Sequence, residues 1–260
     1  MLILVPPSEG KAAPRRGRPL DPASLSFPEL AAPRAEVLDA LVALCTSDDP
    51  ADAARVLGLG PTQGEEVRRD AAVRDAPAAR ADRVYSGVLY EALDLGSLDG
   101  AARRRATSRL AVTSALFGLL RPGDRIPAYR LSGGVSLPGL GAVSAHWSRH
   151  LDPAVRAAVG RGLVVDLRSS TYASFWRPAR DLAPRVVSVR VLQEHDGRRA
   201  VVSHLNKATK GRLVRDLLLD GGTPATPGRF ADLLGSLGWK VQPGPAGRHG
   251  ALLDVVVSEV

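Results

Sequence analysis

The sequence predicts a mixed α/β fold, of the α+β kind, in one domain that spans residues 1–260. Short apolar runs that fit strands alternate with longer segments whose apolar residues recur at helical spacing. The chain has 260 residues, of which 45% are hydrophobic, and this is enough to bury a sizeable core. No low-complexity linker and no internal repeat divides it, so we expect a single compact unit.

The first strand is predicted at Met1–Val5, an apolar run that ends at two prolines. A loop follows over residues 7–22, where Ser8-Glu9-Gly10-Lys11 either presents N–H groups and an ammonium to a phosphate or is a charged surface loop. Helical patterns come next: residues 28–45, residues 51–81 with a break at 58–61, and residues 99–108 with three consecutive arginines. Between the last two, residues 85–95 mix tyrosines with apolar residues and are expected to pack on the core.

The stretch Ser114–Gly134 is predicted to begin in a helix and to turn sharply. Apolar residues at Val112, Ala115, Leu116, Leu119 and Leu120 have the spacing of one helix face. Arg121-Pro122-Gly123-Asp124 then favours a type II turn, with proline at its second position and glycine at its third. The arginines around this turn and the pair Gly133-Gly134 either hold an anion or are solvated.

Residues 137–141 (LPGLG), followed by a helical pattern, match the hairpin of helix-hairpin-helix modules. In such modules backbone amides at a helix start bind a DNA phosphate, here at Gly139 and Gly141. His146 and Trp147 on the following helix are expected in the core or at its edge.

Residues 162–168 predict a strand that leads into the polar corner Ser169–Tyr172, a place where mixed α/β folds often bind a ligand. Asp166 lies inside this apolar strand, and a buried carboxylate needs a partner. Two interpretations stand: an ion pair with an arginine, or a catalytic acid or base.

The C-terminal third predicts a β-hairpin, two helices and a last strand. The hairpin joins residues 186–192 to 200–205 through a turn at Asp196-Gly197. Asn206 is the predicted N-cap of a helix that ends at Gly221-Gly222. A helix within 230–239 and a strand at 252–257 complete the chain.

The first turns of the helix predicted to begin at Asn206 would hold Lys207, Lys210 and Arg212. Cations at a helix start are disfavoured by the helix dipole, by about 0.3–1 kcal/mol each. Their presence therefore indicates a site for an incoming phosphate.

The charge of the chain favours a polyanionic partner. Lys and Arg number 35 against 27 Asp and Glu, a formal net charge of +8. Only four of the cations are lysines, and the heavy use of Ala, Arg, Gly and Pro spreads arginine widely, so positions weigh more than the total.

Cys45 is the one cysteine, and it falls in an apolar periodic run. It permits no intrachain disulfide and no cysteine-based metal cluster. The apolar start is too short for a signal peptide, and no later run is long enough to span a membrane. We expect a cytoplasmic protein that has no membrane partner, metal or cofactor.

Several of these segments together resemble the YaaA family of bacterial peroxide-stress proteins. The resemblance covers about residues 1–220 and runs in order through MLILVPPSEGK, YSGV at 85–88, LFGLLRPGD, AYRLSGG, Trp147, VVDLRSSTY and residues 203–215. It implies an α/β domain of unusual topology with a helix-hairpin-helix-like element and a basic cleft. It also implies a protein that binds duplex or distorted DNA and limits oxidative damage under peroxide.

We therefore predict a DNA-binding protein that reads backbone and shape and protects the cell against peroxide. The residues predicted to contact phosphate are Lys11, Arg121, Tyr129, Arg130, Gly139, Gly141, Lys207, Lys210 and Arg212. The alternative is an enzyme that acts on a nucleobase, nucleotide or similar small anion in the same cleft. Its candidate catalytic residues are Lys11, Asp166, Ser169 and Tyr172. A third, weaker interpretation is a ligand-responsive regulator or scaffold.

Overall fold

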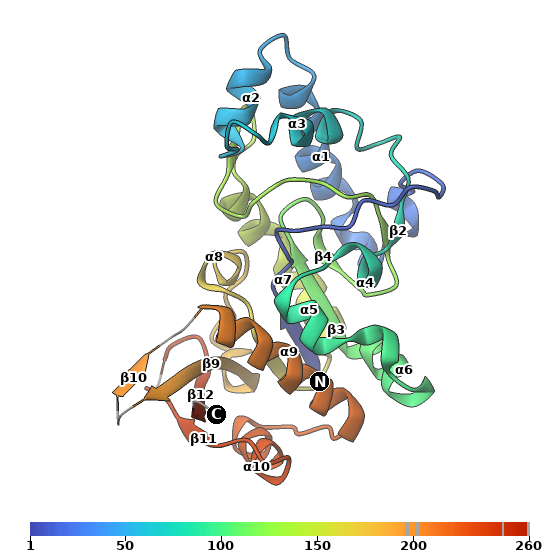
Figure 1. The fold of residues 1–260 in the computed structure, drawn as a ribbon. Helices are drawn as coiled ribbons and strands as arrows, with labels where there is room; N and C mark the ends of the chain where they lie inside the picture. Colours follow the sequence, from blue (N-terminus) through green and yellow to red (C-terminus); the bar gives the residue numbers. More distant parts are fainter. Residues whose placement is uncertain (196–197, 201–202, 246, 259–260) are drawn as a thin grey trace.

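A mostly parallel sheet forms the centre of the molecule (Figure 1). The description covers residues 1–195, 198–200, 203–245 and 247–258 of a computed structural model. The strand order is β11 (Val241–Pro243), β12 (Ala251–Ser258), β9 (Val186–His195), β8 (Val164–Asp166), β1 (Leu2–Val5), β3 (Leu110–Ser114) and β4 (Gly118–Leu120). β10 (Arg198–Ala200) pairs with β9 outside this path. β12, β9, β8, β1 and β3 are parallel, whereas β4, β10 and β11 pair antiparallel.

The direction in which strands are added to the sheet reverses between β1 and β8. From β1 the chain passes to β3 on one side and later returns to β8 on the other side. β1 and β8 are neighbouring strands, and the loops that follow their carboxyl ends therefore lead away from each other. In open α/β sheets such a switch point is where ligands bind.

Helices surround the sheet. Their bounds are α1 (Ala31–Cys45), α2 (Pro50–Val56), α3 (Gly64–Ala71), α4 (Ala81–Val84), α5 (Val88–Leu93), α6 (Gly100–Arg109), α7 (Val143–Val159), α8 (Ser170–Ala173), α9 (Ser203–Asp220) and α10 (Pro227–Ser236). Single 3₁₀ turns lie at Pro22–Ser24, Pro28–Leu30, Leu95–Ser97 and Ala183–Arg185. In Figure 1, α5, α6 and α9 lie together in front of the sheet, and α1, α2 and α3 form the upper part of the molecule.

The core is built on strands that are buried on both faces. All four residues of β1 and all five of β3 are buried, as parallel strands between helical layers require. Trp147 of α7 packs over Gly118 and donates from its indole nitrogen to Ala115 O at 2.7 Å. Cys45 is buried as predicted, and burial raises the pKa of its thiol to about 12.

The predicted helix around Val112–Leu120 is wrong: these residues form β3, a short connection and β4. Both strands are buried on both faces, so most of their residues are apolar. A run of this kind also contains apolar residues at the spacing of one helix face, and this led to the wrong prediction. The turn that follows is closed by Asp124 N–H to Arg121 O at 3.1 Å, but Gly123 has no positive φ, so it is not a type II turn. The Asp124 carboxylate holds it by accepting from Arg121 N–H at 2.8 Å.

The predicted N-cap at Asn206 is also wrong, because α9 begins at Ser203 and Asn206 lies inside it. The predicted helix end is confirmed, with Gly221 at φ 86° directly after Asp220. The turn predicted at Asp196-Gly197 lies outside the described residues.

A helix-hairpin-helix is not shown among the described residues. β6 (Ser136–Leu137) and β7 (Gly141–Ala142) form the hairpin, with Gly139 and Gly141 at positive φ, and α7 follows it. However, residues 127–135 before the hairpin form loop and turn. A second small sheet pairs β2 (Ala79–Arg80) with β5 (Arg125–Ile126). None of the helices in the described part of the chain has the length and apolar character needed to span a membrane.

Candidate functional site

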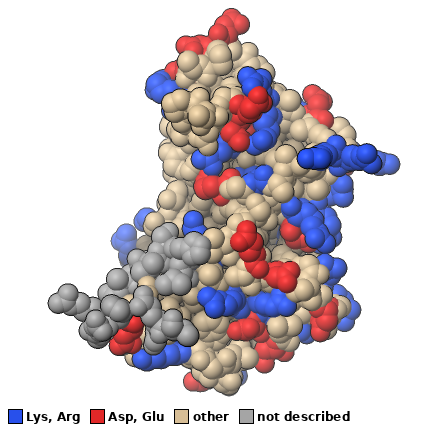
Figure 2. Space-filling model, viewed as in Figure 1, with Lys and Arg blue, Asp and Glu red and all other residues tan. Residues whose placement is uncertain are grey.

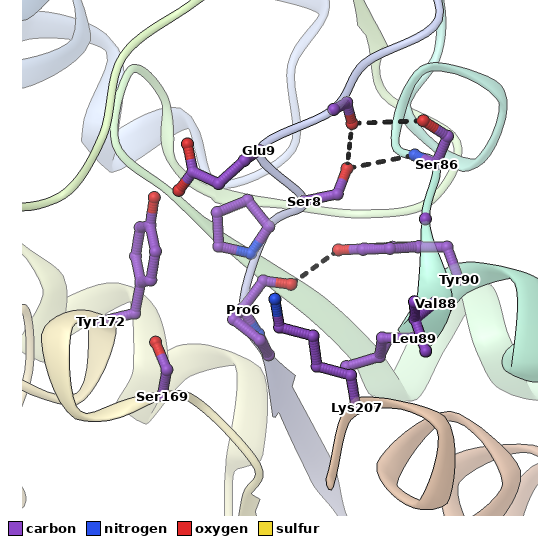
Figure 3. Close-up of a pocket in the computed structure, with 13 residues that line it drawn as sticks. Pro6, Ser8, Glu9, Ser86, Val88, Leu89, Tyr90, Ser169, Tyr172 and Lys207 are labelled. Atoms are coloured by element: carbon purple, nitrogen blue, oxygen red, sulfur yellow. Dashed lines mark hydrogen bonds between the residues drawn. The ribbon is translucent and has the colours of Figure 1, made fainter. Parts of the chain in front are cut away.

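A pocket of about 370 Å³ opens at the carboxyl ends of β1 and β8, at the switch point of the sheet (Figure 3). It brings together the loop after β1, the start of α5, the corner after β8 and one residue of α9. The lining residues are Pro6, Pro7, Ser8, Glu9, Gly10, Ser86, Gly87, Val88, Leu89, Tyr90, Ser169, Tyr172 and Lys207.

The loop after β1 is fixed by hydrogen bonds to the segment that leads into α5. Tyr90 donates its hydroxyl to Pro6 O at 2.8 Å. Ser8 Oγ accepts from Ser86 N–H at 3.1 Å and donates to Gly10 O. The two prolines end β1 and keep the loop extended, so residues 6–10 form a defined wall of the pocket.

Lys207 supplies the pocket with a cation. It is exposed, and Figure 3 shows its side chain rising from α9 into the pocket with the ammonium near Pro6. Within the described part of the chain, the Lys207 ammonium has neither an ion pair nor a hydrogen bond. A ligand anion would therefore meet a charge that is not already neutralised.

Lys210, one turn further along α9, is engaged instead. Its buried ammonium donates to Leu167 O at 2.9 Å and to Arg168 O at 3.4 Å. Burial lowers its pKa. Lys210 thus secures the chain after β8, and it does not line the pocket.

Lys11 lies behind the wall. Its ammonium donates to Ser8 O at 3.0 Å and lies 4.2 Å from the centroid of the Tyr129 ring. Tyr129 is itself buried, and its hydroxyl bonds to those of Tyr85 at 2.9 Å and Ser114 at 2.8 Å. Burial lowers the pKa of Lys11 to about 8.

Glu9 and Arg130 join the pocket loop to the segment after β5. Arg130 donates to Glu9 Oε2 at 2.6 Å, and its backbone N–H donates to Asp70 Oδ1 at 2.8 Å. Asp70 in α3 is fully buried, and its Oδ2 has no hydrogen-bond partner among the described residues. Burial raises the pKa of Asp70 to about 7.

The corner after β8 contributes two hydroxyl groups. Ser169 and Tyr172 line the pocket, and burial raises the pKa of the Tyr172 phenol, so it stays protonated. Asp166 does not reach the pocket and forms a buried ion pair with Arg168 at 2.8 Å, one of the two interpretations that the sequence left open. Burial alone would raise the pKa of Asp166, but Arg168 holds it below its ordinary value.

The remaining predicted phosphate contacts lie elsewhere. Arg121 donates to Leu110 O at 3.0 Å and stacks on Phe27, so it lies at the amino end of β3, at the sheet edge opposite the pocket. Gly139 and Gly141 are exposed in their hairpin, and Arg212 is exposed on α9 outside the pocket lining. In Figure 2 the basic and acidic side chains of the visible face are interspersed. A single basic cleft is therefore not shown.

The pocket combines apolar walls with a few polar groups. Pro6, Pro7, Val88 and Leu89 offer apolar contact, while Ser169, Tyr172 and Glu9 offer hydrogen-bonding groups. In Figure 3, Glu9 and Tyr172 approach each other at one end of the pocket. Such a set can hold a ligand that has a planar apolar part and an anionic part.

Sequence reasoning did not identify the α5 side of this pocket or Asp70. Residues 85–95 were expected to pack on the core, and Tyr85 does so, but Ser86, Val88 and Tyr90 also line the pocket. The Ser-Gly pair just before an apolar run was the available sign. Asp70 lies in a helix rich in charged residues, where nothing in the pattern marks the one that is buried.

The comparisons with known proteins agree on one family. The family model described as peroxide stress protein YaaA matches residues 1–230. A UPF0246 protein of Streptomyces coelicolor is 50% identical over 263 residues, covering 100% of both chains. A UPF0246 protein of Corynebacterium efficiens is 42% identical, covering 93% of this chain and 95% of its own. A UPF0246 protein of Corynebacterium glutamicum is 41% identical over 223 residues, covering 84% of this chain and 85% of its own. With a family model over most of its length and relatives matched almost end to end, the chain belongs to the peroxide stress protein YaaA family.

Proposed function

We propose that this chain serves a peroxide-stress role by binding a nucleotide in the pocket between the β1 loop, α5 and α9. The nucleotide is either free or an unpaired unit of a distorted DNA strand. The observation that carries the proposal is the position of the pocket, at the carboxyl ends of two parallel strands where the strand order reverses.

The size and lining of the pocket support a ligand of this class. Small-molecule sites commonly measure about 300–1,000 Å³, and this pocket falls in that range. The apolar wall suits a base, the hydroxyl groups suit a sugar or base edge, and Lys207 suits a phosphate. A pocket of this volume does not admit a duplex, so DNA would present a single unstacked nucleotide.

The DNA-binding prediction from the sequence continues in this narrower form. Lys207 at the pocket and Arg212 further along α9 are both exposed to solvent and remain candidates for contacts to flanking phosphates. Binding would follow backbone and shape rather than base sequence.

The test is calorimetric titration of the purified protein with AMP, GMP, CMP and UMP, and with a duplex that carries one unpaired nucleotide. We expect Lys207→Met to weaken nucleotide binding about tenfold or more, because a hydrogen bond to a charged group is worth about 1.5–3 kcal/mol. Arg212→Met removes one charge from the same helix outside the pocket and should bind mononucleotides like the parent.

Two results would count against the proposal: no binding of any mononucleotide or of the unpaired nucleotide, or equal affinity of the Lys207→Met variant and the parent. Binding of free nucleotides alone would identify a small-molecule site. Tighter binding of the distorted duplex than of the matched duplex would identify DNA as the source.

A further inference from the structure

Lys11 lies too far behind the pocket wall to be one of its lining residues, yet it is bonded to that wall. Its ammonium donates to Ser8 O at 3.0 Å and to Glu9 O at 3.4 Å, the carbonyls of two residues that line the pocket. It therefore closes the loop 8–11 on itself. The backbone at Lys11 is anchored from outside by a β-bridge to Tyr85.

We infer that Lys11 is a positioning residue of the pocket, whose ammonium holds the Ser8–Gly10 wall in its ligand-binding form. This inference rests on the proposed function, because it concerns affinity at the same site. It replaces the direct phosphate or catalytic contact that the sequence suggested for Lys11.

The surroundings of Lys11 explain why its charge matters to the wall. The Tyr129 ring lies 4.2 Å and the Tyr85 ring 5.8 Å from the nitrogen, and both faces attract a cation. The charged groups that face Lys11 are Glu9 of its own loop, Arg130 after β5, and Asp70 and Glu66 of α3. Within the described residues none of the three carboxylates forms an ion pair with Lys11, and the Arg130 guanidinium repels it, so the loop carbonyls are its main polar partners.

A neutral amine would hold the wall less firmly. Hydrogen bonds from a charged donor are roughly twice as strong as those from a neutral one. Burial lowers the pKa of Lys11 to about 8, so its charge is lost within an accessible pH range. Lys11 is charged below that pH, and ligand affinity should fall as the pH rises through it.

The experiment measures AMP affinity of the full chain from pH 7.5 to 9.5, with inorganic phosphate as a second probe. The phosphate of AMP is a dianion throughout, since the second pKa of a phosphate monoester is near 6. Inorganic phosphate still titrates close to neutral pH, so its affinity is compared between the parent and the variants at each pH. The parent should lose about tenfold in affinity across this range through proton linkage. Lys11→Arg keeps its charge and should give a flat profile. Lys11→Met should bind at every pH as weakly as the parent does at pH 9.5.

Thermal melting of each variant separates a loss of fold from a loss of positioning. A parent that binds AMP at pH 7.5 with unchanged affinity at pH 9.5 would overturn the inference and leave the proposed function standing. So would a folded Lys11→Met variant that binds like the parent. A parent that binds neither probe at pH 7.5 overturns the proposed function, and this inference with it. Should Lys11→Met not fold, a Lys11→Arg profile that falls as steeply as the parent's overturns the inference.

Discussion

The environment of the Asp70 carboxyl group strongly disfavours its charged form. It is a fully buried carboxyl in α3, it accepts one backbone hydrogen bond from Arg130, and its second oxygen has no hydrogen-bond partner among the described residues. Burial raises its pKa to about 7, while an unfolded aspartate titrates near 3.9. Between these values the folded state binds more protons than the unfolded state, so folding stability falls as the pH rises from about 4 to about 7.

Asp70→Asn removes this cost, because an amide does not ionise and keeps an oxygen for Arg130 N–H. We expect the variant to be more stable than the parent at pH 8, by up to about 4 kcal/mol at 1.36 kcal/mol per pKa unit. The advantage should disappear near pH 4. Urea unfolding at both pH values measures it, with the exposed Asp75→Asn as control. A variant less stable than the parent at pH 8 would show that the ionised carboxylate is held by favourable contacts.

Among the helices, the contact between α5 and α9 sets the position of Lys207, which lies in α9. Gly211 allows this contact: a methyl group there would lie 2.2 Å from Leu89 O and 2.9 Å from Ala92 Cβ. A glycine inside a helix costs about 1 kcal/mol relative to alanine, so its presence in α9 has a packing reason.

Gly211→Ala should therefore destabilise the protein by about 2 kcal/mol, since overpacking outweighs the gain in helix propensity. It should also weaken nucleotide binding, because α9 must move away from α5 and carry Lys207 with it. Gly235→Ala in α10 meets no atom within 4 Å and should be neutral or stabilising. Urea unfolding of both variants compares them, and a Gly211→Ala protein as stable as the Gly235→Ala protein would refute this account of the packing.

Elements with one clear pattern were predictable, and elements buried on every side were not. β1 was found from its run of apolar residues before two prolines, and α1 from its helical spacing. β3 and β4 were taken for a helix because a run that is buried on both faces carries no alternation. The parallel pairing of β1 depends on partners more than 100 residues away, such as Leu110 for Ile3, which no local pattern contains.

For the whole molecule, the sequence indicated only some of the residues that line the candidate pocket, because strand ends can be recognised in a sequence and their convergence in space cannot. Ser169 and Tyr172 were named as a ligand corner from the strand before them, and both line the pocket together with Lys207. Arg121 was placed with them from its charge and its turn, yet the antiparallel return of β4 carries it to the opposite edge of the sheet. The sequence shows which residues are cationic, but only the fold shows which of these cations already bind carbonyl or carboxylate groups of the protein.

This distinction yields a prediction for duplex DNA. Each phosphate neutralised by a cation contributes about 0.9 to the slope of log affinity against log salt. If Lys11, Arg121, Arg130, Lys207, Lys210 and Arg212 all bound phosphate, the slope would be about −5. In the structure Lys11 and Lys210 are bonded to backbone carbonyls, Arg130 to Glu9, and Arg121 lies at the far edge.

Only Lys207 and Arg212 of this set remain for phosphates, so we expect a slope near −2 for a duplex with one unpaired nucleotide. Fluorescence anisotropy between 50 and about 200 mM salt, the range in which phosphate contacts change affinity most, measures it. Lys207→Met should reduce the slope by about one, and Arg121→Met should leave it unchanged. A slope of about −5 that Arg121→Met also reduces would mean that DNA contacts both edges of the sheet. The partner would then be bound along the whole molecule and not at the pocket, because no single nucleotide spans from the amino end of β3 to the carboxyl end of β1.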